Sequence, residues 1–365
     1  MSTTLLEPSP KTDSSSHKQL TEAYYTICPV FVASNIAVEL GWLDEEFKRV
    51  GAKATYLRSL ANNAGWLPHY THGLENLFRD GGAIPTILAR ADLTSTKLIG
   101  LTWAQTGGHI VVRSDSGIHR VADLKGRKFG IVTSLNKNKV DFSRATAHRG
   151  ILLALELAGL SEKDVPIVDL DDTDDPKFAP AERPWAFWAQ SRAHRSNPKL
   201  AQDLVALQEG RIHAIYANPG RSDSLVASGD YTVIEDLAQY PDWTLQVANG
   251  PYTNAVNTEF AQAHPEVVVA FLRASVRAGR WINRNRAAAA EIFKRVTFYD
   301  NVKLIEQQIA NADFVPQLSP KNIAAIEIQK KFLRDHGYVT NDFAVSDWAD
   351  SSYLEEAIRS LPAED

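Results

Sequence analysis

Cysteine is nearly missing from this sequence, which has only Cys28 among its 365 residues. A single cysteine excludes an intramolecular disulfide and any zinc site built on paired cysteines. Long apolar runs are missing too, so no segment is expected to span a membrane. No stretch is rich in lysine and arginine, and the net charge of −5 gives no sign of nucleic-acid binding. Serine-hydrolase elbows, phosphate loops and dinucleotide fingerprints do not occur, which leaves those enzyme classes without support.

The N-terminal segment is rich in serine, threonine and proline and lacks the basic start and apolar run of a secretory signal peptide. We expect a disordered tail over residues 1–19 and a cytoplasmic protein. The remaining chain is too long for one small core, which favours two compact lobes. Its composition, 44% hydrophobic and 23% charged, is typical of a globular protein.

Apolar periodicity predicts strands that alternate with helices along most of the chain. Strands are expected at 23–27, 53–60, 97–105, 109–113, 128–132, 165–168, 212–216, 231–235 and within 247–256, and helices at 31–43, 69–78, 84–90, 149–160, 200–209, 265–296, from 320 to near 337, and 348–360. This alternation indicates an α/β fold with two parallel sheets. Such sheets bind ligands at the carboxyl ends of their strands, and Cys28 lies at the end of the first one.

Three residues near this strand end suggest a thiol site with an anion clamp. A helix that begins just after Cys28 would make the thiol more reactive. His69 could set the protonation state of the thiol, and Arg79 offers a planar fork for two oxygens of a small anion. The backbone of Gly81 and Gly82 can approach such an anion closely.

Each of these residues also has a purely structural interpretation. Cys28 could be a small buried hydrophobe, Arg79 could cap a helix C-terminus, and the glycine pair could be only a turn. His69, His72 and Glu75 provide too few ligands at known spacing for a metal site, so a surface helix face is favoured there.

Two larger groups of side chains are also ambiguous. Four tryptophans are candidates for an aromatic wall, although core packing accounts for each one singly; they are Trp66, Trp103, Trp185 and Trp188. Four arginines recur at helical spacing and are interpreted as a solvated face; they are Arg273, Arg277, Arg280 and Arg284.

Two stretches, VVRSDSGIHRVADLKGRKFGIV and the later VNTEFAQAHPEVVVAFLRASVRAGRWI, resemble the type II periplasmic-binding-protein-like fold. More narrowly, they are similar to the superfamily that binds nitrate, sulfonates and taurine and includes pyrimidine-biosynthesis proteins. The resemblance implies lobe one from 20–117 plus 243–365, lobe two from 118–242, and a ligand cleft between them.

A second pattern resembles the aromatic sulfinate desulfinases of the dibenzothiophene desulfurisation route. It comprises Cys28-Pro29-Val30, His69-Tyr70, Arg79, Gly81-Gly82 and Ile84-Pro85, with Thr26 two residues before the cysteine and the ending VSDWADSSYLEEAI. The resemblance implies catalytic roles for Cys28, His69 and Arg79. It implies substrate binding by Thr26, Tyr70, Gly81 and Gly82, with no metal and no cofactor.

The chain departs from that family where an aromatic pocket residue is expected. The family has a substrate-facing tryptophan near the start of the helix predicted at 149, where this chain has Thr146 or His148. The stretches PWAFW at 184–188 and ANPGR at 217–221 are not close matches either. A changed aryl pocket is therefore expected.

The predicted function is hydrolysis of the C–S bond of an aryl sulfinate with release of sulfite. Cys28 would act as a nucleophile or as a proton donor, and the residues do not choose between these. The alternative is a non-catalytic binding protein for an aromatic or sulfonated compound, although no export signal precedes the fold. A pyrimidine-synthase-like relative is disfavoured, because that family needs a cysteine-rich motif. We expect a monomer whose partner is the small-molecule sulfinate, without nucleic acid or membrane.

Overall fold

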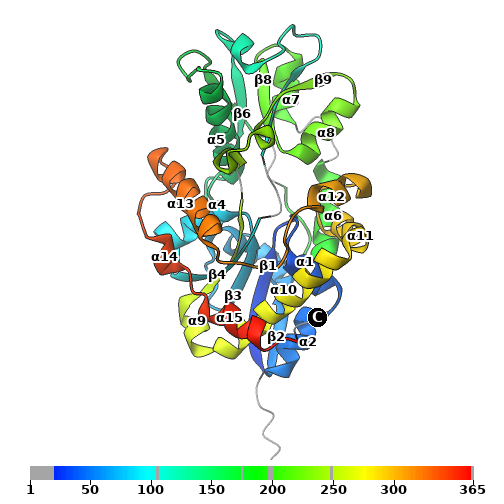
Figure 1. Ribbon diagram of the computed structural model, residues 1–365, viewed down its shortest axis with the longest axis vertical. Helices are drawn as coiled ribbons and strands as arrows, with labels where there is room; N and C mark the ends of the chain where they lie inside the picture. The colour runs from blue at the N-terminus through cyan, green and yellow to red at the C-terminus, as the bar shows by residue number, and fades with distance from the viewer. Residues whose placement is uncertain (1–19, 104–106, 174–175, 196–200, 247–249, 363–365) are drawn as a thin grey trace, which may run out of the picture.

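The computed structural model describes residues 20–103, 107–173, 176–195, 201–246 and 250–362. Within them the strands form two five-stranded sheets, with the orders β2-β1-β3-β10-β4 and β7-β6-β8-β5-β9. Figure 1 shows each sheet with its own helices, one lobe above the other. The predicted tail at 1–19 lies outside the described residues.

The first sheet brings the stretch around Cys28 together. Its strands are β1 (Thr21–Ile27), β2 (Ala52–Tyr56), β3 (Leu77–Gly81), β4 (Thr96–Thr102) and β10 (Tyr252–Asn257). β1 runs parallel to both β2 and β3, with Thr26 opposite Arg79 and Ile27 opposite Asp80. β10 is antiparallel to β3 and β4. The carboxyl ends of β1, β2 and β3 therefore meet at one edge of the sheet.

The second sheet has the strands β5 (His109–Arg113), β6 (Phe129–Thr133), β7 (Ile167–Asp171), β8 (Ala214–Ala217) and β9 (Tyr231–Asp236). β6 is parallel to β7 and β8, whereas β5 is antiparallel to β8 and β9. The boundary predicted after residue 117 leaves β5 in lobe one, but the strand pairs inside the second sheet. The chain therefore enters the second sheet before residue 118.

Fifteen helices accompany the sheets in the described residues. They are α1 (Ala33–Glu39), α2 (Trp42–Arg49), α3 (Pro68–Thr71), α4 (Ala83–Leu88), α5 (Phe142–Leu157), α6 (Pro184–Arg195), α7 (Gln202–Gln208), α8 (Pro219–Ala227), α9 (Thr258–Ala263), α10 (Pro265–Arg284), α11 (Arg286–Val296), α12 (Val302–Ile309), α13 (Pro320–Asp335), α14 (Val345–Trp348) and α15 (Ser352–Arg359). Short 3₁₀ helices are η1 (Leu57–Ser59), η2 (Ala61–Asn63), η4 (Val121–Leu124), η6 (Leu237–Gln239) and η7 (Trp243–Gln246), and η3 (Ala89–Leu93) is a π-helix. None of these helices combines the length and the apolarity needed to cross a bilayer.

The core of the first lobe forms between its sheet and α1, α2 and α10. Phe78 of β3 stacks on Phe271 of α10 with ring centroids 4.6 Å apart. A fully buried aromatic side chain of this kind contributes on the order of 2–3 kcal/mol by leaving water. The packing fixes β3 against the helices and thereby fixes the residues that follow at its end.

Several predicted elements differ from the structure. The helix predicted at 69–78 is wrong, because α3 ends at Thr71 and Leu77–Gly81 is a strand. The helix after Cys28 begins at Ala33, so the thiol lies in a loop before it. The long helix predicted at 265–296 divides at Asn285, and the strand predicted to residue 60 ends at Tyr56. The predicted start of α13 is confirmed, since the Ser319 side chain accepts a hydrogen bond from Asn322 N.

The Trp- and Pro-rich stretch forms α6, which packs on the first lobe although its residues fall within the predicted range of lobe two. Phe187 and Trp188 belong to the same buried cluster as Ile27 and Phe31. Trp185 is 49% exposed on the other face of the helix. Helix α6 is consequently part of the surroundings of the Cys28 loop rather than of the second sheet.

Contacts between the lobes involve aromatic side chains. Tyr70 of α3 stacks on Phe142 of α5 with ring centroids 6.0 Å apart. The Tyr338 hydroxyl lies 2.5 Å from Arg144 Nη1 of α5. Since α5 covers the second sheet, these contacts connect that lobe to the region of α3 and α13.

Candidate active site

The Cys28 loop is held by backbone and amide hydrogen bonds. Cys28 N donates to Asp80 O at 2.9 Å, which extends the β1–β3 pairing by one residue. The Asn35 side chain, in the first turn of α1, donates to the carbonyl oxygens of Cys28 and Val30 at 3.1 and 3.0 Å. The loop is therefore ordered by its neighbours, and the half-buried thiol has a fixed position beside β3.

His69 contacts the thiol through one ring nitrogen and a hydroxyl through the other. Its Nε2 lies 3.7 Å from Cys28 Sγ, and its Nδ1 lies 2.6 Å from Thr26 Oγ1. Burial holds the pKa of His69 well below its ordinary value, and the nearby charges of Arg58 and Arg79 lower it further. The imidazole is thus neutral, and Thr26 orients it toward the cysteine.

Arg79 is buried, and three of its donors bind protein atoms. Nε donates to His69 O at 2.8 Å, Nη1 donates to Gly82 O at 2.9 Å, and Nη2 lies 3.5 Å from Cys28 Sγ. The predicted role as a free fork for two substrate oxygens is therefore too simple. Arg79 fixes the histidine and the glycine pair, and only its Nη2 end faces the thiol.

Gly81 provides the space that the thiol occupies. Its φ of +151° is a conformation that side-chain-bearing residues rarely adopt, and a Cβ at this position would lie 2.3 Å from Cys28 Sγ. Gly82 precedes α4, and its carbonyl oxygen accepts from Arg79. The interpretation of these glycines as only a turn is wrong, since Gly81 ends a strand against the cysteine.

Asp80 is a site neighbour that sequence reasoning missed. Its side chain is 1% exposed, Oδ2 accepts from Ser34 Oγ at 2.5 Å, and Oδ1 has no partner among the residues that the structure describes. Burial raises the pKa of Asp80 to about 7, although Ser34 and Arg79 favour the charged form. Aspartate beside two glycines is typical of a turn, so the sequence carried no signal for its burial.

Two further missed residues lie at the carboxyl end of β2. Tyr56 ends the strand and Arg58 lies in the turn η1 that follows. Arg58 is 5% exposed, and its guanidinium stacks over the Phe187 ring at 4.8 Å. Its charge acts on His69 and on Cys28, which puts it within the electrostatic surroundings of the thiol.

Tyr70 connects the histidine to the aromatic side chains around it. Its ring lies edge-on to His69 at 4.8 Å and 5.2 Å from Trp66. Burial raises the pKa of the Tyr70 hydroxyl, which keeps it a neutral donor. Of the four predicted tryptophans only Trp66 contacts Tyr70 in these ring pairs, because Trp103 pairs with Trp243 and Trp188 lies in the core.

The weak metal hypothesis for His69, His72 and Glu75 finds no geometric support. His72 is fully buried with its Nε2 2.9 Å from Leu77 O, and burial lowers its pKa to about 3. Among the residues that the structure describes, no group of three or more His, Cys, Asp or Glu side chains has an arrangement suited to a metal.

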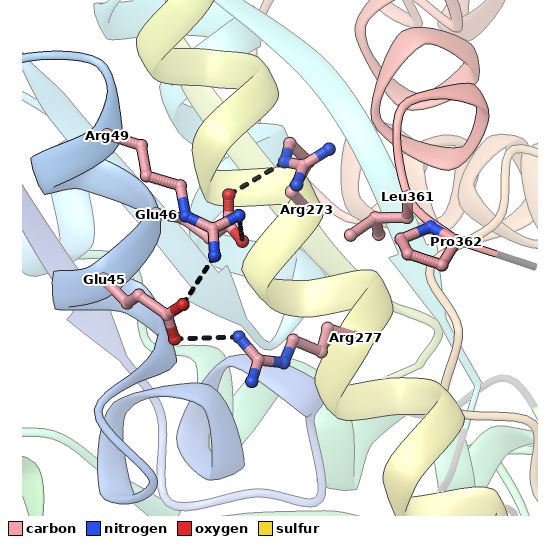
Figure 2. Close-up of a pocket in the computed structure, with 7 residues that line it drawn as sticks. All are labelled: Glu45, Glu46, Arg49, Arg273, Arg277, Leu361 and Pro362. Carbon is pink, nitrogen blue, oxygen red and sulfur yellow. Dashed lines mark hydrogen bonds and ion pairs between the residues drawn. The ribbon is translucent and has the colours of Figure 1, made fainter. Parts of the chain in front are cut away.

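A surface hollow between α2, α10 and the C-terminal segment is lined by charged side chains, as Figure 2 shows. Arg277 binds Glu45 there, and Arg273 binds the buried Glu46. Arg280 donates to Pro362 O. Three of the four arginines predicted as a solvated face thus make structural contacts with carboxylates or a carbonyl oxygen, and no residue of the Cys28 site lines this hollow.

The chain has two lobes, each with one mixed sheet, and polar side chains gather at the strand ends of the first lobe. This architecture is the type II periplasmic-binding-protein-like fold. No family model matches the sequence. The chain is similar to 2'-hydroxybiphenyl-2-sulfinate desulfinase of Rhodococcus erythropolis, with 25% identity over 96% of both chains. The predicted resemblance is confirmed by this relative.

Solved structures agree with that assignment of the fold. A cysteine-to-serine mutant of DszB in complex with biphenyl-2-sulfinic acid superimposes with a TM-score of 0.72 and 20% identity, covering 93% of this chain and 99% of that chain. The periplasmic sulfonate-binding protein SsuA of Methylobacillus flagellatus gives a TM-score of 0.66 at 15% identity, covering 93% and 94%. Both the desulfinase and the binding proteins are therefore relatives in architecture.

Proposed function

We propose that the protein is an aryl sulfinate desulfinase that hydrolyses the C–S bond. The observation that carries the proposal is the thiol of Cys28, which lies 3.7 Å from His69 Nε2 and 3.5 Å from Arg79 Nη2 in the space left by Gly81. A neutral histidine, a thiol and a guanidinium at one point can exchange a proton and bind a sulfinate oxygen.

The overall reaction adds water across the C–S bond. An aryl sulfinate and one water give the arene and hydrogen sulfite, so that the ring carbon gains a proton and sulfur gains an oxygen. In an acid-catalysed route the Cys28 thiol gives its proton to the ring carbon, and the electron pair of the C–S bond becomes the new C–H bond. Sulfur leaves as SO2, water converts it to hydrogen sulfite, and the released proton returns to the thiolate through His69.

A covalent route uses the same atoms in another order. His69 takes the thiol proton, and the Cys28 thiolate attacks sulfur to form an S–S bond. The C–S bond breaks as the protonated His69 delivers its proton to the ring carbon. Water then cleaves the S–S bond and restores the thiol with release of hydrogen sulfite. Thr26 has the same task in both routes, which is to hold the His69 ring toward Cys28.

The relatives support this class of substrate. The curated relative acts on a biphenyl sulfinate, and the solved mutant that binds biphenyl-2-sulfinic acid has lost a cysteine. Tyr70 and Trp66 provide aromatic surface next to His69 for an aryl ring. The second candidate is a sulfonate-binding protein without turnover, which the similarity to SsuA favours.

The test is sulfite release from a panel of aryl sulfinates by the wild type and by the Cys28→Ser and Cys28→Ala variants. Release by the wild type and none above background by either variant supports the desulfinase. A covalent adduct on Cys28 in quenched reactions, seen by mass spectrometry, would select the covalent route. Ligand binding by calorimetry with no sulfite from any sulfinate would instead establish a binding protein.

A further inference from the structure

Two buried donors at the end of β2 have no partner. The Nη1 atom of Arg58 and the hydroxyl of Tyr56 are both buried, and neither forms a hydrogen bond with a described residue. Arg58 is 5% exposed and Tyr56 is 3% exposed. Leaving a buried donor unpaired costs on the order of 1–3 kcal/mol, and more for a charged group, unless a ligand supplies the acceptor.

The two donors lie two residues apart in the chain. Tyr56 and Arg58 act on each other electrostatically, and both act on Cys28. They follow the carboxyl end of β2, which is the neighbour of β1 and lies at the sheet edge where such folds bind ligands. Burial raises the pKa of the Tyr56 hydroxyl, so it remains a neutral donor.

No carboxylate of the described residues forms an ion pair with Arg58. Its stacking partner is Phe187 of α6, whose ring holds the guanidinium plane at 4.8 Å without neutralising it. The backbone of the segment before α6 is tied to the same residue, since Ala181 N donates to Arg58 O at 3.0 Å. Helix α6 thus fixes the position of Arg58, whose guanidinium interacts with the Tyr70 hydroxyl but with no carboxylate of the described residues.

The anionic groups at the site act on Arg79 more than on Arg58, since the Asp80 carboxyl interacts with Arg79. Arg58 and Arg79 both act on His69, which is itself neutral. Arg79 Nη2 faces the thiol, where the sulfinate of the proposed reaction has to lie. A sulfinate held by Arg79 still leaves Nη1 of Arg58 without an acceptor, so a second anionic group can bind there.

We propose that the ligand carries a carboxylate in addition to its sulfinate, and that Arg58 and Tyr56 bind this carboxylate. This inference rests on the proposed function for the reacting group but not for the second anion. A guanidinium beside a neutral hydroxyl matches the two oxygens of a carboxylate. Arg58 is then the residue that determines which aryl sulfinate is accepted.

The first test uses stable sulfonates, so that binding is measured without turnover. Calorimetry compares benzenesulfonate with the ortho, meta and para isomers of sulfobenzoate on the wild type, Arg58→Met and Tyr56→Phe. Tyr25→Phe is the matched control, because its ring packs against Tyr56 at 5.4 Å and the substitution also removes one phenol hydroxyl.

At least one sulfobenzoate isomer is expected to bind the wild type about 10-fold or more tightly than benzenesulfonate. Arg58→Met should abolish this preference, Tyr56→Phe should reduce it several-fold, and Tyr25→Phe should retain it. Equal affinity of the wild type for benzenesulfonate and all three isomers overturns the proposal. So does an equal loss of affinity for both kinds of ligand in Arg58→Met, which would make Arg58 a sulfonyl-binding or structural residue.

Sulfite release separates this inference from the proposed function. The sulfinate that corresponds to the preferred sulfobenzoate isomer should be desulfinated with a higher kcat/KM than benzenesulfinate. If neither sulfinate releases sulfite while the Arg58-dependent binding preference persists, the desulfinase proposal fails and the carboxylate site stands. If sulfite release occurs without any preference, the carboxylate site fails and the desulfinase stands.

Discussion

The sulfur of Cys28 occupies the space that a side chain on Gly81 would need, because a Cβ on Gly81 would lie 2.3 Å from that sulfur. The strand end and the thiol loop therefore fit together only with glycine at this position. This relationship depends on the register of β1 and β3, in which Cys28 N binds Asp80 O.

Gly81→Ala should displace the thiol and abolish sulfite release, because the new methyl group overlaps Sγ. Its φ of +151° adds backbone strain of about 1–3 kcal/mol. Sulfite assays and thermal unfolding measure the two effects. Gly117→Ala is the control, since Gly117 also has a positive φ but open space where a Cβ would lie. Full loss of activity in both variants would contradict the steric explanation.

Thr26→Val should lower kcat/KM by roughly 3- to 10-fold, because the hydrogen bond that orients His69 is lost while the shape is retained. Thr26→Ser keeps the hydroxyl and should restore most of the activity. The measurement is steady-state sulfite release at several substrate concentrations, and the loss should appear mainly in kcat. A change confined to KM would show that Thr26 contacts substrate rather than positioning the ring.

Removal of the Arg58 charge should move the acid limb of kcat/KM to higher pH. A positive guanidinium disfavours the imidazolium. Burial lowers the pKa of His69 most, and the charge of Arg58 lowers it next. Arg58→Met should therefore raise the pKa of His69, so that activity on benzenesulfinate begins to fall at a higher pH than in the wild type. Identical acid limbs in the two proteins would exclude His69 as the titrating group.

Asp80 should make the protein less stable as the pH rises from about 4 to 7. Its carboxyl titrates near 3.9 in an unfolded chain, whereas burial raises its pKa to about 7 in the fold. The folded state binds the proton more tightly, so stability that is present below the unfolded pKa is lost as pH rises through the folded one. Each unit of difference corresponds to about 1.4 kcal/mol.

Asp80→Asn removes this titration and keeps an acceptor for Ser34. Denaturant unfolding of both proteins at pH 5 and pH 8 is the measurement. The variant should gain stability relative to the wild type at the higher pH. A constant difference between the two proteins across this range would mean that Asp80 is ionised throughout.

Glu46→Ala should destabilise the first lobe by about 3–5 kcal/mol while leaving kcat unchanged. Glu46 is 2% exposed and binds Arg273 and Arg49 (Figure 2), so its loss leaves the Arg273 guanidinium without its buried partner. Thermal unfolding and sulfite release of this variant are compared with those of Glu45→Ala, because the Glu45 carboxylate forms its ion pairs on the exposed side. Similar melting temperatures for the two variants would contradict this assignment.

The sequence was sufficient for the two-lobed α/β class, because alternating apolar segments and short turns are local signals. The strand over Leu77–Gly81 was not predictable, since LFRDG has no alternation and becomes a strand only through pairing with β1 and β10. The position of α6 was equally hidden, because Phe187 and Trp188 acquire their burial from residues far away in the chain.

Some residues of the candidate site were likewise predictable from the sequence and others were not. Cys28, His69 and Gly81 carried a recognisable pattern, and the structure brings them together. Arg58 and Asp80 carried none, because a charged residue in a turn is ordinarily exposed. Only the tertiary packing of α6 and α1 buries them, which sequence periodicity does not report.

The residues proposed for the chemistry all lie between Thr26 and Gly82, on strands, loops and the short helix α3 at one sheet edge. The second lobe reaches this edge through side chains such as Phe142, which stacks on Tyr70. Recombination between relatives that exchanges only the segment encoding the second sheet would therefore leave all of these residues, and Arg58 among them, unchanged. In the proposed desulfinase, the reacting groups and the Arg58 site would be inherited together, whereas the contacts that the second lobe makes with α3 could change.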